Sequence, residues 1–367
     1  MYKKNIFRTA WNSSIRSPAK LWLDKNENND IFLEKLYLRI LKKLKFSDIS
    51  AYPDLTETYE KYSKFLGVNK KQIFLTSGSD LAIKSIFDFF IFPGDKVLTT
   101  NPTYAMYGIY CKIFRANNIL LDYKFSQKKP YLDIKKLLFL IKKHKPKLIC
   151  IPNPDSPTGQ IISKKNIEHI LKIAKKNKSL VLLDEAYFLF YKNTFIKYVN
   201  KYNNLIVTRS ASKAMAIAGL RVGVVISNSN LISNIFMQKP MYEISSIGNV
   251  FIKEIIKPNN YKFIKQSVKR LIEGKKLFIE FLKKSNIDYF ESHANFIHVN
   301  FGNFKKKIIT KLENSIYFRG EENHESLKGY SRISLTSKKN FRLIINIIKK
   351  HNKKNDKKYK YSNNWSR

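Results

Sequence analysis

The most informative segment of this 367-residue chain is Ser210-Ala211-Ser212-Lys213, with Arg221 eight residues further on. A lysine amine can form a Schiff base with an aldehyde, while hydroxyls and an arginine can together bind a phosphate dianion. Upstream, the apolar run Leu180-Val181-Leu182-Leu183 ends at Asp184, and a carboxylate placed there can keep a pyridine nitrogen protonated. Each of these groups would bind a different part of one cofactor, pyridoxal 5'-phosphate (PLP).

Each signal has a simpler interpretation when it is taken alone. A lysine in a Ser/Ala turn is usually solvated, and an aspartate at a strand end often caps the next helix. Ser77-Gly78-Ser79-Asp80 offers backbone N–H groups to a phosphate at a helix start, but such turns are common. Tyr104 could stack on a flat ring or be a partly buried core tyrosine. The joint occurrence of the signals is what favours the cofactor site.

Short apolar runs alternate with helical stretches between about residues 55 and 230. A mostly parallel sheet covered by helices on both faces is the architecture that this alternation predicts. We therefore expect an α/β fold with a seven-stranded sheet, and its strand candidates are Ile73-Leu75, Lys96-Thr99, Ile119-Leu121, Leu148-Pro152, Leu180-Asp184, Leu205-Thr208 and Val222-Ile226.

The pattern changes along the chain and suggests a division into parts. Residues 1–50 are expected to form an N-terminal arm and a first helix over Ile31 to Phe46, and residues 51–245 the large PLP-binding domain. Residues 246–348, where a helical stretch from about 249 to 284 precedes short strands, predict a small α+β domain. The polar, basic tail 349–367 has almost nothing to bury and is expected to be disordered.

The formal net charge of +41 would ordinarily suggest a polyanion partner. Here lysine far outnumbers arginine and is spread along the whole chain, whereas a nucleic-acid site usually concentrates arginine with aromatic residues. We therefore interpret the charge as a solvated basic surface, with no specific nucleic-acid partner. A catalytically inactive, basic nucleic-acid-binding protein that keeps this fold is the remote alternative.

The two cysteines, Cys111 and Cys150, cannot build a disulfide framework, and no Cys/His spacing resembles a metal site. A reducing compartment follows from this cysteine usage. The N-terminus is basic but has no apolar core of signal-peptide length, and no apolar run reaches the length of a membrane span. We expect a cytoplasmic protein with no membrane partner and no metal.

The order of the motifs resembles that of the fold-type I PLP-dependent aminotransferases (class I/II), and within them the histidinol-phosphate aminotransferase branch. The resemblance covers about residues 20 to 345. It rests on collinear motifs, which are Leu23-Asp24-Lys25-Asn26-Glu27-Asn28, Tyr52-Pro53-Asp54, Gly78-Ser79-Asp80, Pro102-Thr103-Tyr104-Ala105-Met106-Tyr107, Pro157-Thr158-Gly159, Asp184-Glu185-Ala186-Tyr187, Ser212-Lys213, Ala218-Gly219-Leu220-Arg221-Val222-Gly223, Ala294-Asn295-Phe296 and Arg332-Ile333-Ser334.

The resemblance implies roles for the residues that match its motifs. Lys213 would bond to the cofactor aldehyde and later move the proton between the substrate and the cofactor. Asp184 would pair with the pyridine nitrogen, Tyr187 would donate to the phenolic oxygen, and Tyr104 would stack on the ring. The phosphate ligands would be the backbone at Ser79 and Asp80 together with Ser210, Ser212 and Arg221.

The resemblance also implies a two-fold homodimer, because Tyr52 matches a tyrosine that reaches the cofactor phosphate of the neighbouring subunit. Substrates would be bound by Asn26, Arg319 and Arg332. Arg332 matches the residue that takes the α-carboxylate of glutamate, and Arg319 matches a ligand of the substrate phosphate. A surface arginine is the simpler interpretation of each.

One departure concerns the loop before Pro157-Thr158-Gly159, where the family usually has Asn and this chain has Ser156. Serine is shorter and offers a single donor to the cofactor's phenolic oxygen. The expected reaction is amino transfer between L-glutamate/2-oxoglutarate and a small phosphorylated ketone, with histidinol phosphate/imidazole acetol phosphate as the first candidate. Ser156 keeps two alternatives open, another phosphorylated or sugar-linked ketone and a PLP-dependent decarboxylase of a phosphorylated amino acid such as threonine phosphate.

Overall fold

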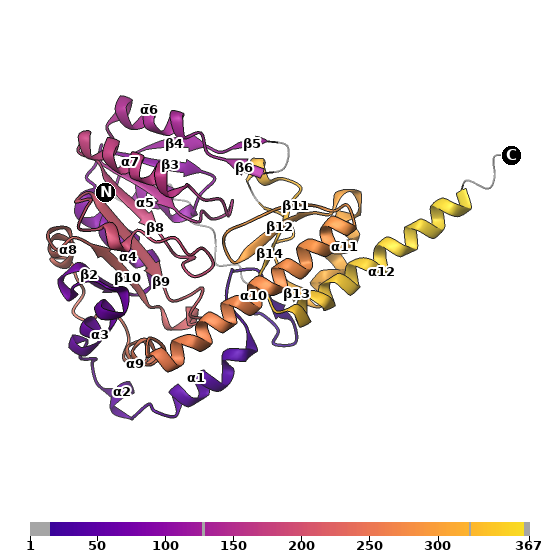
Figure 1. Cartoon of the computed structure of the whole chain (residues 1–367), viewed down its shortest axis with the longest axis horizontal. Helices are drawn as coiled ribbons and strands as arrows, with labels where there is room; N and C mark the ends of the chain where they lie inside the picture. The colour runs from indigo at the N-terminus through magenta and orange to yellow at the C-terminus, as the bar shows by residue number, and fades with distance from the viewer. Residues whose placement is uncertain (1–14, 127–128, 323, 363–367) are drawn as a thin grey trace.

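A large α/β part and a smaller C-terminal part make up the computed structural model, which describes residues 15–126, 129–322 and 324–362 (Figure 1). The large part is built around a seven-stranded sheet in the order β2-β10-β9-β8-β7-β3-β4. Its strands are β2 (Ile73–Thr76), β3 (Lys96–Asn101), β4 (Asn117–Asp122), β7 (Leu148–Pro152), β8 (Leu180–Asp184), β9 (Leu205–Ser210) and β10 (Gly223–Ser227).

All neighbouring strands of this sheet are parallel except β10, which is antiparallel to both β2 and β9. The prediction of a mostly parallel seven-stranded sheet is confirmed. Strands β2, β7 and β10 are buried at every residue, as strands covered on both faces should be. Successive side chains of β8 enter different cores, since Val181 and Leu183 pack in one cluster and Leu182 in the other.

The core containing Leu182 also takes side chains from α4 (Gly78–Phe90), α5 (Ala105–Ile113) and α8 (Ser229–Phe236). The opposite core takes them from α1 (Glu34–Leu41), α3 (Thr56–Leu66), α6 (Ile134–His144), α7 (Lys164–Lys176) and α9 (Ser246–Ile255). Helix α7 shows why the sequence folds this way. Ser163 caps its N-terminus, and Ile167, Ile170, Leu171 and Ala174 form one buried face at helical spacing.

The C-terminal part has its own antiparallel sheet, β11-β12-β14, formed by β11 (Asp288–Phe290), β12 (Phe296–Asn300) and β14 (Ser331–Ser334). Helices α10 (Pro258–Lys284), α11 (Lys305–Glu313) and α12 (Lys338–Ser362) complete it around a separate hydrophobic cluster. The N-terminal arm joins this part, because β1 (Leu21–Trp22) pairs in parallel with β13 (Ile316–Tyr317). The predicted small α+β C-terminal domain is confirmed.

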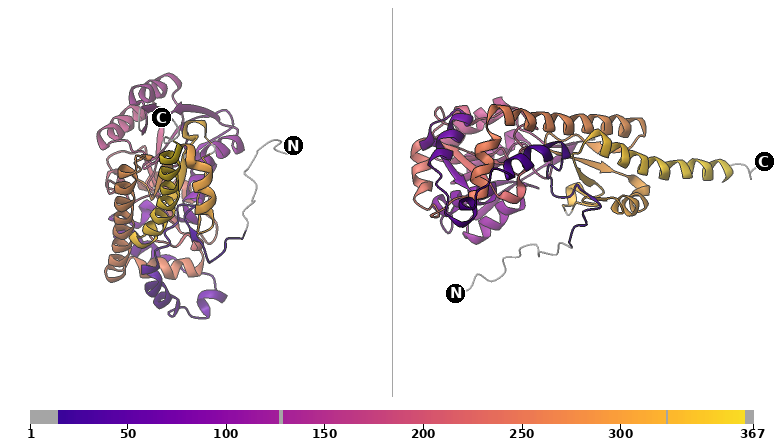
Figure 2. Two further views of the ribbon diagram at one scale, coloured as in Figure 1. Left: turned by 90° about the vertical axis from the view of Figure 1, so that its right-hand side faces the viewer. Right: turned by 90° about the horizontal axis from the view of Figure 1, so that it is seen from below.

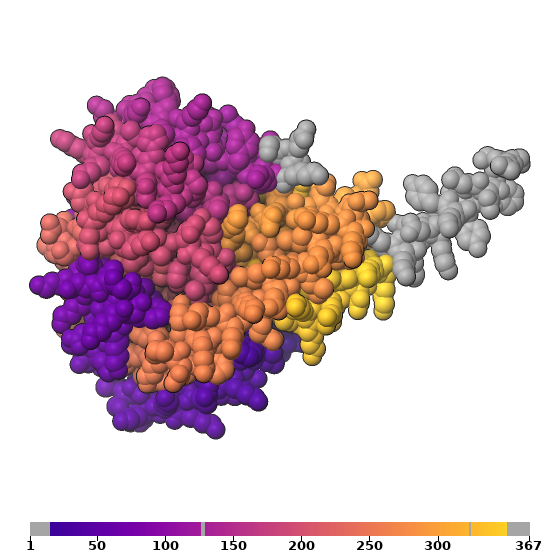
Figure 3. All heavy atoms as spheres, in the orientation of Figure 1, coloured from indigo at the N-terminus to yellow at the C-terminus, as the bar shows by residue number. Residues whose placement is uncertain are grey.

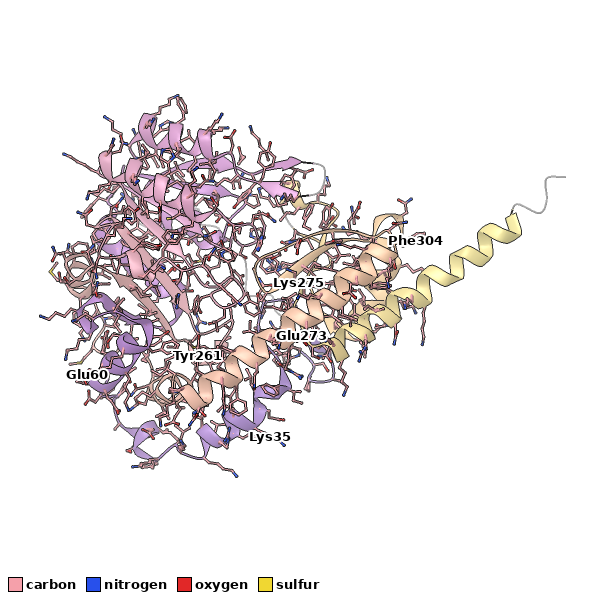
Figure 4. The ribbon with its side chains drawn as sticks, viewed as in Figure 1. Lys35, Glu60, Tyr261, Glu273, Lys275 and Phe304 are labelled. Carbon is pink, nitrogen blue, oxygen red and sulfur yellow. The ribbon has the colours of Figure 1, made fainter. Side chains whose placement is uncertain are left out.

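Helix α10 connects the two parts, and Figure 3 shows it as a diagonal band across the front of the molecule. Near its start, Tyr261 packs edge-on against Phe65 of α3, with ring centroids 4.7 Å apart. Further along, Glu273 forms an ion pair of 3.1 Å with Lys338 of α12, and Lys275 donates to the carbonyl of Ser292. Figure 4 shows these positions succeeding one another along the helix.

Helix α12 projects away from the body of the molecule (Figure 2). Its backbone continues through residues 349–362 of the tail for which we expected disorder. Residues 1–14 and 363–367 lie outside the described residues, as do the side chains from residue 351 onward. Within the described chain, no helix combines the length and the apolar character that a membrane crossing requires.

Some predicted elements differ from those in the structure. The expected helix over residues 31 to 46 is a 3-10 turn (Ile31–Leu33) followed by α1, and a separate short helix α2 (Ser47–Ser50) comes after it. The expected helix from 249 to 284 is two helices, α9 and α10, because Pro258 starts a new helix at its first turn. The small hairpin of β5 (Lys124–Ser126) and β6 (Lys129–Tyr131) was not predicted.

Candidate active site

A cavity of about 450 Å³ lies where the carboxyl ends of the parallel strands face the C-terminal part. Residues from the arm, the sheet and the C-terminal part line it together. Its walls include every predicted site residue except Tyr52, and the predicted members are Asn26, Ser79, Asp80, Tyr104, Ser156, Asp184, Tyr187, Ser210, Ser212, Lys213, Arg221, Arg319 and Arg332. The structure therefore brings together segments about 300 residues apart in sequence.

Lys213 follows β9 and reaches the cavity from the turn after the strand. Its Nζ donates to the backbone carbonyl of Lys25 at 3.0 Å. Burial lowers the pKa of this amine to about 8, while the nearby Glu27 carboxylate opposes the shift. A larger share of Lys213 is thus neutral near pH 8 than of a solvated lysine, which is what a nucleophile or a base requires.

Asp184 ends strand β8 at the floor of the cavity and is 5% exposed. It accepts hydrogen bonds from the Tyr107 hydroxyl at 3.2 Å, the Thr208 hydroxyl at 3.1 Å and the Ala186 N–H at 3.1 Å. Burial nevertheless raises the pKa of this carboxyl to about 6. A cation placed beside it would relieve the cost of the buried charge. Asp184 is therefore suited to hold a protonated ring nitrogen.

Sequence reasoning missed the residues that orient Asp184. Tyr107 lies in the Pro102-to-Tyr107 motif, and Thr208 lies directly opposite Asp184 in the pairing of β8 with β9. Both residues lie near the carboxyl ends of parallel strands, Thr208 in β9 and Tyr107 in α5 directly after β3, and this position could have marked them as site residues. The register between strands, which brings Thr208 next to Asp184, could not be obtained from the motifs.

Backbone and side-chain donors converge at the start of α4. Gly78 has a left-handed φ of +81°, and a Cβ built on it would lie 2.3 Å from Nη2 of Arg221. Gly223 is equally constrained, because its Cβ would lie 2.4 Å from the carbonyl carbon of Gly78. Arg221 Nη1 donates to the Ser212 hydroxyl at 3.4 Å. Glycine is needed at both positions for this close approach of backbone and guanidinium.

The next turn completes the group of donors. Ser210 Oγ accepts from the N–H of Ser212 at 3.1 Å, so both hydroxyls sit in the same turn as Lys213. Asp80 uses its carboxylate to accept from Tyr110 at 2.8 Å, and its backbone N–H belongs to the first turn of α4. N–H groups at a helix start, serine hydroxyls and an arginine form an anion site.

Aromatic and polar side chains form the remaining walls. Tyr104 is partly buried and meets Tyr107 edge-on at 6.0 Å. Tyr187 is 5% exposed, and its hydroxyl accepts from Asn26 Nδ2 at 3.0 Å. Burial raises the pKa of Tyr187, so its hydroxyl stays protonated and able to donate.

Arg319 and Arg332 lie beside each other, since each backbone N–H donates to the other residue's carbonyl, at 3.1 and 2.8 Å. Arg332 is 5% exposed and has its Nε 3.1 Å from Oε1 of Glu322. Arg319 is more exposed, and its Nη1 lies 3.7 Å from the other Glu322 oxygen. Burial lowers the pKa of Arg332, and the Glu322 carboxylate opposes the change. Two guanidinium groups thus share one carboxylate at the cavity wall.

Glu322 and its buried neighbour His298 were not predicted. His298 is fully buried on β12, directly opposite Arg332 in the strand pairing, and its Nε2 lies 3.7 Å from Glu322 Oε1. Burial lowers the pKa of His298, which favours a neutral ring. Acidic residues are scarce in this basic chain, and the acidic pair Glu321-Glu322, which begins two residues after Arg319, was a usable signal.

Tyr52 is not part of the cavity of its own chain. Its ring is 78% exposed and stacks on Tyr242 with centroids 4.2 Å apart. Other exposed apolar side chains precede each tyrosine in the sequence. They are Phe46 and Ile49 before Tyr52, and Met237 and Met241 before Tyr242.

The residues of the cavity fit PLP. The anion site, the Asp184 carboxylate, the Lys213 amine and the tyrosine walls, all of which line one cavity, match the phosphate, the pyridine nitrogen, the aldehyde and the ring. The two glycines, at which any side chain would collide with the anion site, are consistent with a bound phosphate.

Comparisons with known proteins agree with this geometry. A family model described as aminotransferase class I and II matches residues 18–348. A histidinol-phosphate aminotransferase of Caldanaerobacter subterraneus subsp. tengcongensis is 33% identical over 339 residues, covering 90% of this chain and 93% of the relative. One from Buchnera aphidicola subsp. Schizaphis graminum is 30% identical over 354 residues, 95% of each chain.

Solved structures of similar fold include two of different activity. The histidinol-phosphate aminotransferase from Sinorhizobium meliloti in complex with PLP has a TM-score of 0.77 at 20% identity, covering 90% of this chain and 91% of the other. The L-threonine-O-3-phosphate decarboxylase from Porphyromonas gingivalis has a TM-score of 0.74 at 16% identity, covering 91% and 99%. At these identities the likeness concerns the fold alone.

Proposed function

The chain belongs to the class I and II aminotransferases, and from this premise we propose that it moves an amino group between L-glutamate and a small phosphorylated ketone. The prediction of a PLP-dependent aminotransferase is confirmed by the family match. Histidinol phosphate and imidazole acetol phosphate are the substrate pair that we propose first, because the curated relatives are histidinol-phosphate aminotransferases.

Each part of the cavity has a task in holding the cofactor. The first turn of α4, with Ser210, Ser212 and Arg221, would hold the phosphate, and Asp184 would hold the ring nitrogen in its protonated state. Tyr104 and Tyr187 would contact the ring and its phenolic oxygen. When bound, PLP supplies an electron sink that makes the α-hydrogen of an amino substrate acidic.

Lys213 is the residue that moves the proton in this proposal. Lys213 lines the cavity, and its lowered pKa of about 8 leaves part of the amine neutral at physiological pH. A neutral Nζ can accept the α-proton of the bound amino substrate. The protonated Nζ would then deliver that proton to the carbon on the other side of the amino nitrogen, and hydrolysis by one water would release the keto product and leave the amino group on the cofactor.

The paired arginines are the single observation that carries the choice of substrate. A guanidinium binds carboxylate and phosphate oxygens through two parallel hydrogen bonds. Arg332 is the more buried member, so we assign it to the α-carboxylate of glutamate, and the more exposed Arg319 to the substrate phosphate. Glutamate and the phosphorylated substrate must therefore use the same cavity in turn, which is a ping-pong order of binding.

We further propose that the enzyme works as a homodimer in the cytoplasm. Tyr52 lies outside its own cavity, where it is exposed and stacked on Tyr242, which supports a role in the site of the partner subunit. Both cysteines are unpaired and buried, which supports a reducing compartment. Mixing subunits that carry Lys213→Ala with subunits that carry Tyr52→Ala tests sharing of the site, because only a shared site regains activity in the hybrid.

Steady-state turnover with L-histidinol phosphate and 2-oxoglutarate tests the proposed reaction. Arg319→Met should raise KM for histidinol phosphate more than KM for 2-oxoglutarate, whereas Arg342→Met, on the exposed face of α12, should change neither. Turnover of glutamate without turnover of histidinol phosphate would move the search to other phosphorylated or sugar-linked ketones. Release of carbon dioxide from threonine phosphate would instead establish a decarboxylase.

A further inference from the structure

Asn26, in the N-terminal arm, uses all its polar groups to join Tyr187 to the C-terminal part. It is 4% exposed, and its Nδ2 donates to the Tyr187 hydroxyl at 3.0 Å. Its backbone N–H donates to Ser334 Oγ at 3.0 Å, and its backbone carbonyl accepts from Asn295 Nδ2 at 2.8 Å. Its Oδ1 accepts a longer bond of 3.4 Å from the same Ser334 hydroxyl.

The backbone conformation of Asn26 also restricts which residues can occupy this position. Its φ of +56° lies in the left-handed region, which asparagine tolerates better than most residues other than glycine. The neighbouring carbonyl of Lys25 accepts from Lys213 Nζ, and Asn28 Nδ2 donates to the carbonyl of Ala214 at 3.2 Å. This short segment of the arm therefore contacts Tyr187 and the turn that carries Lys213.

The hydrogen bonds of Tyr187 determine where its proton can point. A phenol has one O–H to donate and accepts through its lone pairs. Asn26 Nδ2–H occupies one acceptor position of this oxygen. A hydroxyl that already accepts from a donor becomes a stronger donor itself. The O–H of Tyr187 is thus left free to donate into the cavity.

We propose that Asn26 is a positioning residue that orients and strengthens the Tyr187 hydroxyl as the donor to the phenolic oxygen of PLP. In this chain Asn26 thereby offsets the loss of the amide donor that Ser156 replaces. The inference rests on the proposed function, because it assumes that PLP bonded to Lys213 occupies the cavity. It goes beyond the substrate contact that the sequence suggested for Asn26.

The consequence is a shift in the titration of the lysine-bound cofactor. A donor to the phenolic oxygen stabilises its anion and so lowers the pKa of the adjacent cofactor nitrogen bonded to Lys213. Weakening the donor raises that pKa. Asn26→Gly is the suitable variant, because glycine adopts the left-handed φ without strain while it removes the amide.

The test is a spectrophotometric pH titration of the PLP-loaded protein, which follows the cofactor absorbance without any turnover. Asn26→Gly should raise the pKa by roughly 0.4 to 1 unit, the equivalent of one neutral hydrogen bond. Asn29→Ala is the matched control, since Asn29 lies in the same arm but is exposed and donates to the carbonyl of Trp22. It should leave the pKa unchanged.

A double-mutant cycle separates positioning from general disturbance of the arm. In a Tyr187→Phe background, Asn26→Gly should cause no further shift, because the hydroxyl through which it acts is gone. An equal shift in both backgrounds, or no shift in the wild-type background, overturns the inference. Should Asn26→Gly fail to fold, Ser334→Ala removes a partner of Asn26 and should raise the pKa by a smaller amount. A protein that never shows the absorbance of lysine-bound PLP contradicts the proposed function instead.

Discussion

Replacing Gly78 by alanine should weaken the binding of PLP and also destabilise the folded protein. The new Cβ would lie 2.3 Å from Arg221 Nη2 and 2.9 Å from Cζ, so the guanidinium must leave its place. Loss of one charge-assisted hydrogen bond costs about 1.5 to 3 kcal/mol, which corresponds to a rise of about 10- to 150-fold in the Kd for PLP. The left-handed φ of +81° adds about 1 to 2 kcal/mol of strain in the folded state.

Gly94 provides the control for that strain. Its φ is +88°, it is exposed, and a Cβ there would meet no atom within 4 Å. Gly94→Ala should therefore lose a similar free energy of unfolding while its Kd for PLP stays unchanged. Both quantities are measurable, by urea denaturation and by absorbance titration of the cofactor-free protein with PLP. Equal Kd values for Gly78→Ala and wild type would refute the assignment of this turn and Arg221 to the phosphate.

Three further predictions concern buried ionisable groups. Because burial lowers the pKa of Lys213 from 10.5 to about 8, the rate of PLP uptake by the cofactor-free protein should rise about tenfold per pH unit and level off above pH 8; a stopped-flow rate that keeps rising to pH 10 would contradict this. Burial raises the pKa of Asp155 from 3.8 to about 7, so the folded state binds this proton more tightly than the unfolded state. The resulting stability is full below about pH 4 and is lost as the pH rises to 7, and the difference in free energy of unfolding between wild type and Asp155→Asn should fall over that window. Glu185 accepts from Arg209 at 2.9 and 3.1 Å, with both side chains buried, and Glu185→Leu should cost about 3 to 5 kcal/mol in urea denaturation. The double variant with Arg209→Leu should lose less than the two single changes added together; strict additivity would show that the pair is not coupled.

The sequence allowed the strands, the cofactor and most of the cavity wall to be predicted, for identifiable reasons. Strand ends and motif residues coincide at Asp184 and Lys213, since the carboxyl ends of parallel strands meet at one edge of the sheet. The order of strands in the sheet could not be obtained, because the position of β10 between β2 and β9 depends on contacts distant in sequence.

Contacts between separate segments account for what was missed. Glu322 and His298 meet Arg332 through the register of β12 with β14, which no local pattern encodes. The bond from Asn26 to Tyr187 joins residues 161 positions apart. The break at Pro258 is different, because the residue before a proline is disfavoured in a helix and the helix boundary was legible in the sequence.

Amino transfer from a phosphorylated substrate can be followed in a single half-reaction. PLP-loaded protein is mixed with L-histidinol phosphate in the absence of any acceptor, and the absorption spectrum is recorded before and after. We predict that the absorbance of lysine-bound PLP is replaced by that of the aminated cofactor, with one equivalent of ketone formed per site. The proposed substrate would be contradicted if histidinol phosphate left the spectrum unchanged while glutamate still converted the cofactor of the same protein.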